Sequence, residues 1–149
     1  RSRRKIILIM TISEIYEYIK RSAEEKVGVE SVYLTEPYNS WNVVEVRYGS
    51  VCIFIDSVQI DKQERRYRIN LYYGDILTET NDNLFSVQNT AVEILSAIIK
   101  DLGAIEGVYM TGSTDINLFK QNFTDILGGG YCSFMLNERI SNCPKMNKY

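Results

Sequence analysis

The sequence predicts one α+β domain with a mostly antiparallel sheet and two helices packed on one of its faces. Two stretches with apolar residues at every third or fourth position are each followed by runs of strand-like segments. The predicted order is α-β-β-β-α-β-β-β, and strands that run together between single helices favour this layered arrangement. The length of 149 residues suits one domain with a sizeable core. We assign that domain to residues 10–140 and a C-terminal tail to residues 141–149.

The first predicted helix begins at Thr11, which has capping-box spacing to Glu14. We expect Gly28 to terminate this helix. Met10 precedes the cap and resembles a translation start, so residues 1–9 are interpreted as an N-terminal extension or, alternatively, as an added strand. The apolar stripe of the helix contains Ile12, Ile15, Tyr16, Ile19, Ala23 and Val27.

The second predicted helix follows an acidic, turn-forming stretch over residues 74–83. Asn81 or Asp82 is the expected N-cap, and Gly103 is the expected stop. The helix has an apolar stripe at helical spacing, which predicts that one side packs on the sheet. The stripe contains Leu84, Val87, Ala91, Ile94, Leu95, Ile98 and Leu102.

The strands are predicted from apolar alternation and from the turns between them. Residues 41–48 and 51–58 are expected to form a hairpin through Gly49 and Ser50, because a leading glycine suits a type II′ turn. Residues 64–73 alternate strictly, which predicts a strand with one wet face. The remaining predicted strands are residues 107–112, 116–123 and, after Gly128-Gly129-Gly130, 131–137.

Two of the predicted strands are apolar on both faces. In residues 51–58, Val51 and Ile53 alternate with Cys52 and Phe54, and residues 131–137 show the same property. Because two helices cover only one face of the sheet, the second face needs either another subunit or the chain folding back as a β-sandwich. The interface hypothesis includes the acidic loop and names Cys52, Phe54, Tyr72, Cys132, Phe134, Asp75, Glu79 and Asp82.

The composition argues against several functional classes. The chain has no histidine, the most common general base and a common metal ligand, so we expect no enzyme, no metal site and no cofactor. Its net charge of −2 provides no overall positive potential that would attract nucleic acid or an anionic membrane. Cys52, Cys132 and Cys143 lack metal-ligand spacing and are expected to be reduced thiols. The longest apolar run, residues 6–10, is too short to span a bilayer, and we expect a soluble, unexported protein.

Three local patterns allow other interpretations. The three glycines at 128–130 lack the Lys-Ser or Lys-Thr of a phosphate-binding loop and favour a tight turn, a bulge or a close chain approach. The group Asp56, Asp61, Lys62 and Glu64 has the composition of a nuclease site, but its spacing favours a solvated hairpin end. Residues 64–68 combine arginine with tyrosine, as nucleic-acid platforms do, although the alternation places Tyr67 on the face opposite Arg66.

Two stretches resemble the tail-terminator and tail-completion proteins of tailed bacteriophages, which include head-tail connector and neck proteins. One is Asp82-Asn83-Leu84-Phe85 and the helix that follows it through Ile98. The other runs from Phe119 through Gly128-Gly129-Gly130 to Phe134. The resemblance also covers the order of the elements from Met10 to about Asn137.

The resemblance implies a structural virion protein of the tail end or head-tail junction that forms a ring, six-fold in tails and twelve-fold nearer the portal. It implies self-association, contact with neighbouring neck or tail proteins, and DNA only as passing cargo. The expected location is the virion, and the host cytoplasm during assembly. It implies no catalytic or cofactor residue. A small metal-dependent nuclease and a monomeric nucleic-acid-binding module remain the alternative hypotheses.

Overall fold

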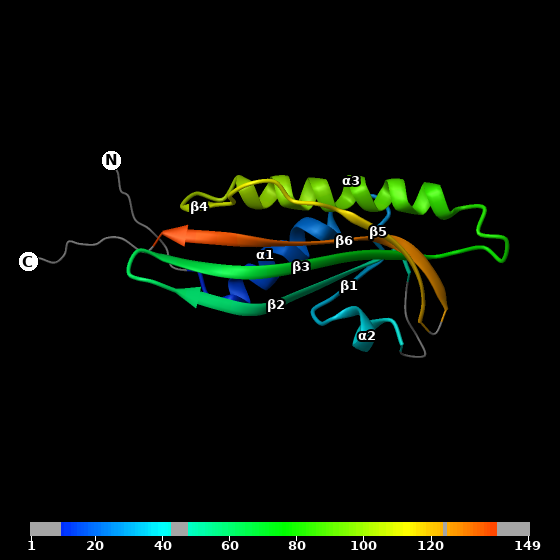
Figure 1. Cartoon of the computed structure of the whole chain (residues 1–149), viewed down its shortest axis with the longest axis horizontal. Helices are drawn as coiled ribbons and strands as arrows, with labels where there is room; N and C mark the ends of the chain where they lie inside the picture. Colours follow the sequence, from blue (N-terminus) through cyan, green and yellow to red (C-terminus); the bar gives the residue numbers. More distant parts are fainter. Residues whose placement is uncertain (1–9, 43–47, 124, 140–149) are drawn as a thin grey trace, which may run out of the picture.

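The computed structural model describes residues 10–42, 48–123 and 125–139, and it confirms the α+β class. The predicted extension at 1–9 and the predicted tail at 141–149 lie outside the described residues. The described elements are shown in Figure 1, and in chain order they are α1 (Ile12–Glu24), β1 (Ser31–Tyr33), α2 (Pro37–Ser40), β2 (Ser50–Ile60), β3 (Glu64–Ile76), α3 (Leu84–Gly103), β4 (Val108–Tyr109), β5 (Asn117–Asn122) and β6 (Ile126–Arg139).

The strands form one sheet of six strands in the order β1-β2-β3-β6-β4, and β5 also pairs with β6. Only β1 and β2 pair in parallel among the described strands. Strand β6 pairs with β3 along its whole length, with β5 over its first residues and with β4 near its end. The sheet is therefore mostly antiparallel, as predicted, and β3 and β6 form its central pair.

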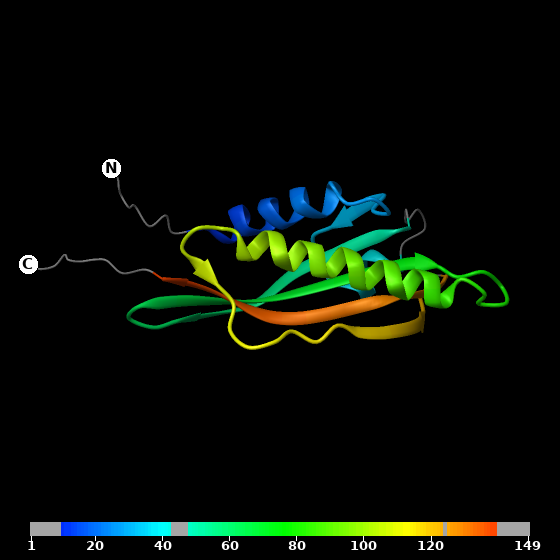
Figure 2. The ribbon, with the colours of Figure 1, turned by 90° about the horizontal axis from the view of Figure 1, so that it is seen from above.

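Helices α1 and α3 lie side by side over one face of the sheet (Figure 2), where α1 packs on β1 and β2 and α3 packs on β3 and β6. The predicted capping box is confirmed, since Thr11 Oγ1 accepts from Glu14 N at 3.1 Å and Glu14 Oε1 accepts from Thr11 N at 2.8 Å. Asp101 of α3 joins the helices, because its Oδ2 lies 2.6 Å from both Ser22 Oγ and Lys26 Nζ. This layer covers the larger core.

The predicted hairpin strand over residues 41–48 is wrong in its described part, and residues 43–47 lie outside it. Pro37 occupies the first turn of the short helix α2, a position that proline favours. Trp41 ends α2 and is fully buried, with its Nε1 donating to Ser50 Oγ at 2.7 Å. The strand that pairs with the start of β2 is instead β1, and Gly49 O accepts from Glu30 N at 2.7 Å just before it.

The three glycines lie inside β6 and do not form the predicted turn before it. Glycine is needed at these positions because other groups approach the backbone closely. A Cβ atom at Gly129 would lie 1.8 Å from the main-chain oxygen of Tyr73 on β3, and one at Gly128 would lie 2.9 Å from Leu77 Cδ2. Of the alternatives given by the sequence, close chain approach is therefore the one that the structure supports.

The end of α1 and the start of α3 differ slightly from the prediction. The N-cap of α3 is Asn83, not Asn81 or Asp82, because Asn81 adopts a positive φ of 61° in the preceding turn. The Asn83 amide spans the loop, accepting from Thr78 N and donating to Ile76 O at 3.0 Å each. Helix α1 ends at Glu24, before Gly28, and α3 ends at Gly103 as predicted.

Candidate interaction surface

The sheet face opposite α1 and α3 carries a continuous row of aromatic side chains. Tyr72 on β3 lies between Phe54 on β2 and Tyr131 on β6. The ring centroids are 6.1 Å and 5.2 Å from Tyr72, and the ring planes are nearly parallel. Phe119 on β5 extends the row, 6.4 Å from Tyr131. We call these four residues the aromatic bed.

The alternation of the strands places the bed on this face. In β3, Tyr67, Ile69, Leu71 and Tyr73 are buried under the helices, whereas Tyr72 points to the other side, as predicted. The register pairs Tyr72 with Tyr131, so the two central strands present their aromatic rings on the same face. Because side chains in adjacent strands stand about 5 Å apart, such pairs stack across the sheet.

The described residues cover only one part of this face. A smaller core forms there from Trp41, Cys52 and Leu127, all fully buried. The Trp41 ring meets Phe123 edge-on at a centroid distance of 5.2 Å and reaches Phe119 at 6.1 Å. Helix α2 lies below the sheet on the side away from α3 (Figure 1). The described residues contain one sheet, so the predicted β-sandwich alternative is not the observed arrangement.

An open hollow of about 620 Å³ lies between α2, the bed and the turn after β5. Phe54 and Tyr72 form its apolar floor, while Glu36 lines it as a charged residue. Tyr38 is 72% exposed although it is aromatic. The residues around the hollow are Glu36, Pro37, Tyr38, Asn42, Phe54, Tyr72, Gln121, Asn122 and Phe123. The hollow is therefore an open, partly apolar depression beside the buried Trp41.

Burial shifts the pKa of one hydroxyl and one thiol on this face towards the uncharged form. Burial, with a smaller contribution from Tyr131, raises the pKa of the Tyr72 hydroxyl above its usual value. Burial also raises the pKa of the Cys52 thiol to about 12, and that of Cys132 on the opposite face to about 12. A thiol with such a pKa is a poor nucleophile. The surface is therefore suited to contact and not to thiolate chemistry.

The predicted interface residues separate into two groups on opposite faces of the sheet. Phe54 and Tyr72 lie together in the bed, and Cys52 lies buried beneath Trp41 on the same side. The expectation that Cys132 and Phe134 belong to an open face is wrong, because both pack in the core under the helices. The register explains this placement, since Cys132 pairs with Leu71 and Phe134 pairs with Ile69, which also face the helices.

The predicted acidic residues lie elsewhere. Asp75 Oδ1 accepts from Gly49 N at 3.1 Å and from Ile76 N at 2.8 Å, so this carboxylate fixes the end of β3. Glu79 and Asp82 are exposed in the loop between β3 and α3. That loop lies at the end of the molecule opposite the β2–β3 turn (Figure 1). The structure therefore does not bring these acids to the aromatic bed.

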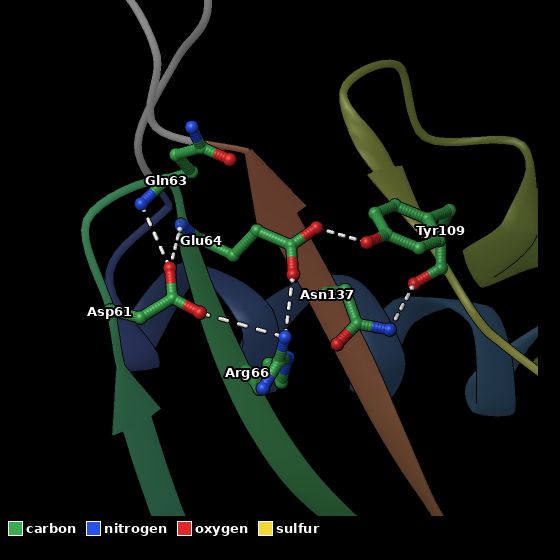
Figure 3. Close-up of polar contacts among 6 residues, drawn as sticks. All are labelled: Asp61, Gln63, Glu64, Arg66, Tyr109 and Asn137. Atoms are coloured by element: carbon green, nitrogen blue, oxygen red, sulfur yellow. Dashed lines mark hydrogen bonds and ion pairs between the residues drawn. The ribbon is translucent and has the colours of Figure 1, made fainter.

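The β2–β3 turn holds three of the four residues that the sequence suggested as a nuclease site, Asp61, Lys62 and Glu64, and Figure 3 shows the contacts of Asp61 and Glu64. Asp61 Oδ1 accepts from Gln63 N and Glu64 N at 2.8 Å each, and these bonds hold its pKa below the usual value. Arg66 Nη2 lies 3.0 Å from Glu64 Oε1 and 3.5 Å from Asp61 Oδ2.

The same network ties the turn to β4. The Tyr109 hydroxyl donates to the second carboxylate oxygen of Glu64 and lowers the pKa of Glu64, while Asn137 Nδ2 donates to Tyr109 O at 3.2 Å (Figure 3). Asp56 lies 3.9 Å from Arg68, apart from this network. The described part of the chain contains no group of three or more acidic or cysteine side chains placed to hold a metal ion. The carboxylates therefore brace the turn.

Sequence reasoning missed three aromatic residues of this surface. Tyr131 alternates with Cys132, so its side was predictable only after the face of Cys132 was known. Phe119 lies on a short edge strand, and Trp41 was assigned to a strand and not to a buried cap. The signal was the high aromatic content of the segments around β5 and β6.

Comparison with protein-family models gives no match for this chain, and comparison with curated protein sequences gives none either. Among the helices in the described ranges, none has the length and apolar character needed to cross a membrane. The geometry of the surface is therefore what indicates the function of this chain.

Proposed function

We propose that this protein is a structural assembly subunit that associates with copies of itself through the aromatic bed. The observation that carries the proposal is the row of Phe54, Tyr72, Tyr131 and Phe119 on a sheet face that the described residues cover only in part. Contiguous apolar surface of this kind marks sites of protein contact. Aromatic anchors of the same type dominate the binding energy of interfaces.

The resemblance to phage tail-terminator and tail-completion proteins supports a more specific form of the proposal. In that form the subunits build a ring at the tail end or head-tail junction of a virion. Neighbouring neck or tail proteins are its other partners, and DNA is cargo that passes through the ring. The virion, and the host cytoplasm during assembly, are then the places where it works.

One observation favours a second candidate, a nucleic-acid-binding module. Arg68 lies on the same face as the bed, because it alternates with the buried Tyr67 and Ile69, and its side chain is half exposed. Bases stack on exposed aromatic rings beside cations. The bed rings, however, stack on one another, and Asp56 lies 3.9 Å from the Arg68 guanidinium. Salt-dependent binding of short oligonucleotides would favour this second candidate.

The proposal is tested by placing a charge on the bed and measuring the mass of the particles in solution. Tyr131 is 37% exposed, so Tyr131→Asp leaves the fold intact while placing an ion against an apolar partner. The matched control is Phe85→Asp, because Phe85 is an exposed aromatic on α3, away from the bed.

We expect the wild type and Phe85→Asp to sediment as multiples of the 17.2 kDa chain. Tyr131→Asp should sediment as a monomer with unchanged circular dichroism. A monomeric wild type, or an assembly that Tyr131→Asp leaves intact, would contradict the proposal.

A further inference from the structure

A second apolar surface lies on the outer part of the β2–β3 hairpin. Val58 is 38% exposed and Ile60 is 69% exposed, and they stand two residues apart on the same side of β2. We call these two residues the arm patch. Strand β3 pairs with β2 at the arm patch, but β1 pairs only with Ser50–Cys52, so the other edge of β2 has no described strand beside it there. Figure 2 shows the hairpin projecting from beneath the two helices.

The arm patch is held by a rigid hairpin. Strand β3 pairs with β2 on one side and with β6 on the other, as far as Glu64 opposite Arg139. The carboxylates of Asp61 and Glu64 fix the turn through Arg66 and Tyr109 (Figure 3). A preorganised hairpin loses little conformational freedom when it binds, which favours its use as an interface element.

The arm patch and the aromatic bed face opposite sides of the sheet. Val58 pairs with Tyr67, whose side chain packs in the helix-covered core, whereas the bed surrounds Tyr72 on the other face. A two-fold contact joins the same surface of two copies. Because these two patches face apart, a pair of copies cannot bury both patches of each copy at once.

We propose that the arm patch of one copy docks in the hollow of the aromatic bed on the next copy, head to tail. This inference rests on the proposed function and specifies its contact. Repetition of one such heterologous contact closes into a ring when the rotation allows it. The occupant of the hollow is thus a second copy of this chain, and the apolar residues that enter the hollow are Val58 and Ile60.

The charges beside the two surfaces are complementary. In the turn, Arg66 binds both Asp61 and Glu64, and Lys62, two residues after Ile60, adds an exposed positive charge. The hollow has Glu36 in its lining. Opposite charges at the border of an interface steer encounter and select the partner. Lys62 of one copy would therefore lie near Glu36 of the next.

The decisive experiment mixes two variants, each of which lacks one of the two surfaces. The arm variant carries Val58→Asp and Ile60→Asp. The bed variant carries Tyr131→Asp in the bed together with Tyr38→Asp, because Tyr38 is exposed and lines the hollow. Each variant alone should be a folded monomer by circular dichroism and sedimentation. When mixed, the intact bed of the first variant should accept the intact arm of the second, which yields a one-to-one heterodimer and no larger particle.

The matched control is Val92→Asp, because Val92 on α3 is 37% exposed, close to the 38% of Val58, but belongs to neither surface. This control should assemble like the wild type. An arm variant that assembles normally, or a mixture that stays monomeric although the wild type assembles, would overturn the head-to-tail contact while leaving the bed as an interface. A monomeric wild type would instead refute the proposed function, and this inference with it.

A charge exchange gives an independent check on orientation. Lys62→Glu should weaken association by about two- to fivefold, as expected for a border ion pair. Addition of Glu36→Lys in the same chain should restore it, because each contact then pairs the exchanged charges. An additive loss in the double variant would show that Lys62 and Glu36 do not meet.

Discussion

Replacing Phe134 tests which face of β6 belongs to the core of the subunit. The Phe134 side chain is 8% exposed and lies opposite Ile69 beneath the helices. Truncation of a buried phenylalanine to alanine costs about 3–5 kcal/mol of unfolding free energy, since transfer and cavity terms add. A domain of this size loses about 2–4 °C of melting temperature per kcal/mol, so Phe134→Ala should melt roughly 6–20 °C lower.

The comparison is Phe54→Ala, which removes the same ring from the aromatic bed. Phe54 is half-buried and has solvent on one side, so its truncation should cost the subunit about 1–2 kcal/mol. Thermal unfolding followed by circular dichroism, at a concentration at which the protein is monomeric, separates the two variants. If Phe54→Ala melts at the lower temperature, the assignment of faces is wrong.

Two further predictions concern buried groups. Burial raises the pKa of Glu138, so its ionised form is disfavoured in the fold; the stability of the wild type relative to Glu138→Gln should therefore fall as the pH rises from about 4.3 towards the higher folded pKa. Melting temperatures measured between about pH 3.5, below the usual glutamate pKa, and about pH 8 check this. A difference between the two proteins that does not vary with pH would refute it. Gly129→Ala should lower stability by about 1–3 kcal/mol or more, because its Cβ would lie 1.8 Å from Tyr73 O. Gly103→Ala is the control, since its Cβ would meet only Met110 Cε at 3.6 Å, and equal denaturation midpoints for the two variants would contradict the close approach.

Local signals in the sequence predicted the helices and the central strand well. The Thr11 and Glu14 capping box is formed, and α3 spans the apolar stripe up to Gly103. The alternation in β3 is observed as predicted, with Tyr67 inside and Tyr72 outside. These features depend on contacts within a few residues, which a single sequence contains.

The errors arose where distant contacts decide the structure. Alternation shows that Tyr131 and Phe134 lie on opposite sides of β6, but only the register with β3 determines which side meets the helices. Trp41 is not in the strand predicted from the sequence but at the end of α2. On the face opposite the helices it is buried and donates a hydrogen bond to Ser50. Gly129 is required by the backbone of another strand. No spacing rule within one segment contains that information.

The most direct test of the central claim is oxidative footprinting of aromatic side chains in assembled and dissociated protein. We predict that Tyr131 and Tyr38, which are exposed in the single subunit, become protected on assembly, whereas Phe85 on α3 is labelled equally in both states. Protection of Tyr131 would locate the contact on the aromatic bed. Equal labelling of Tyr131 in the two states, or a protein that never assembles, would contradict the account.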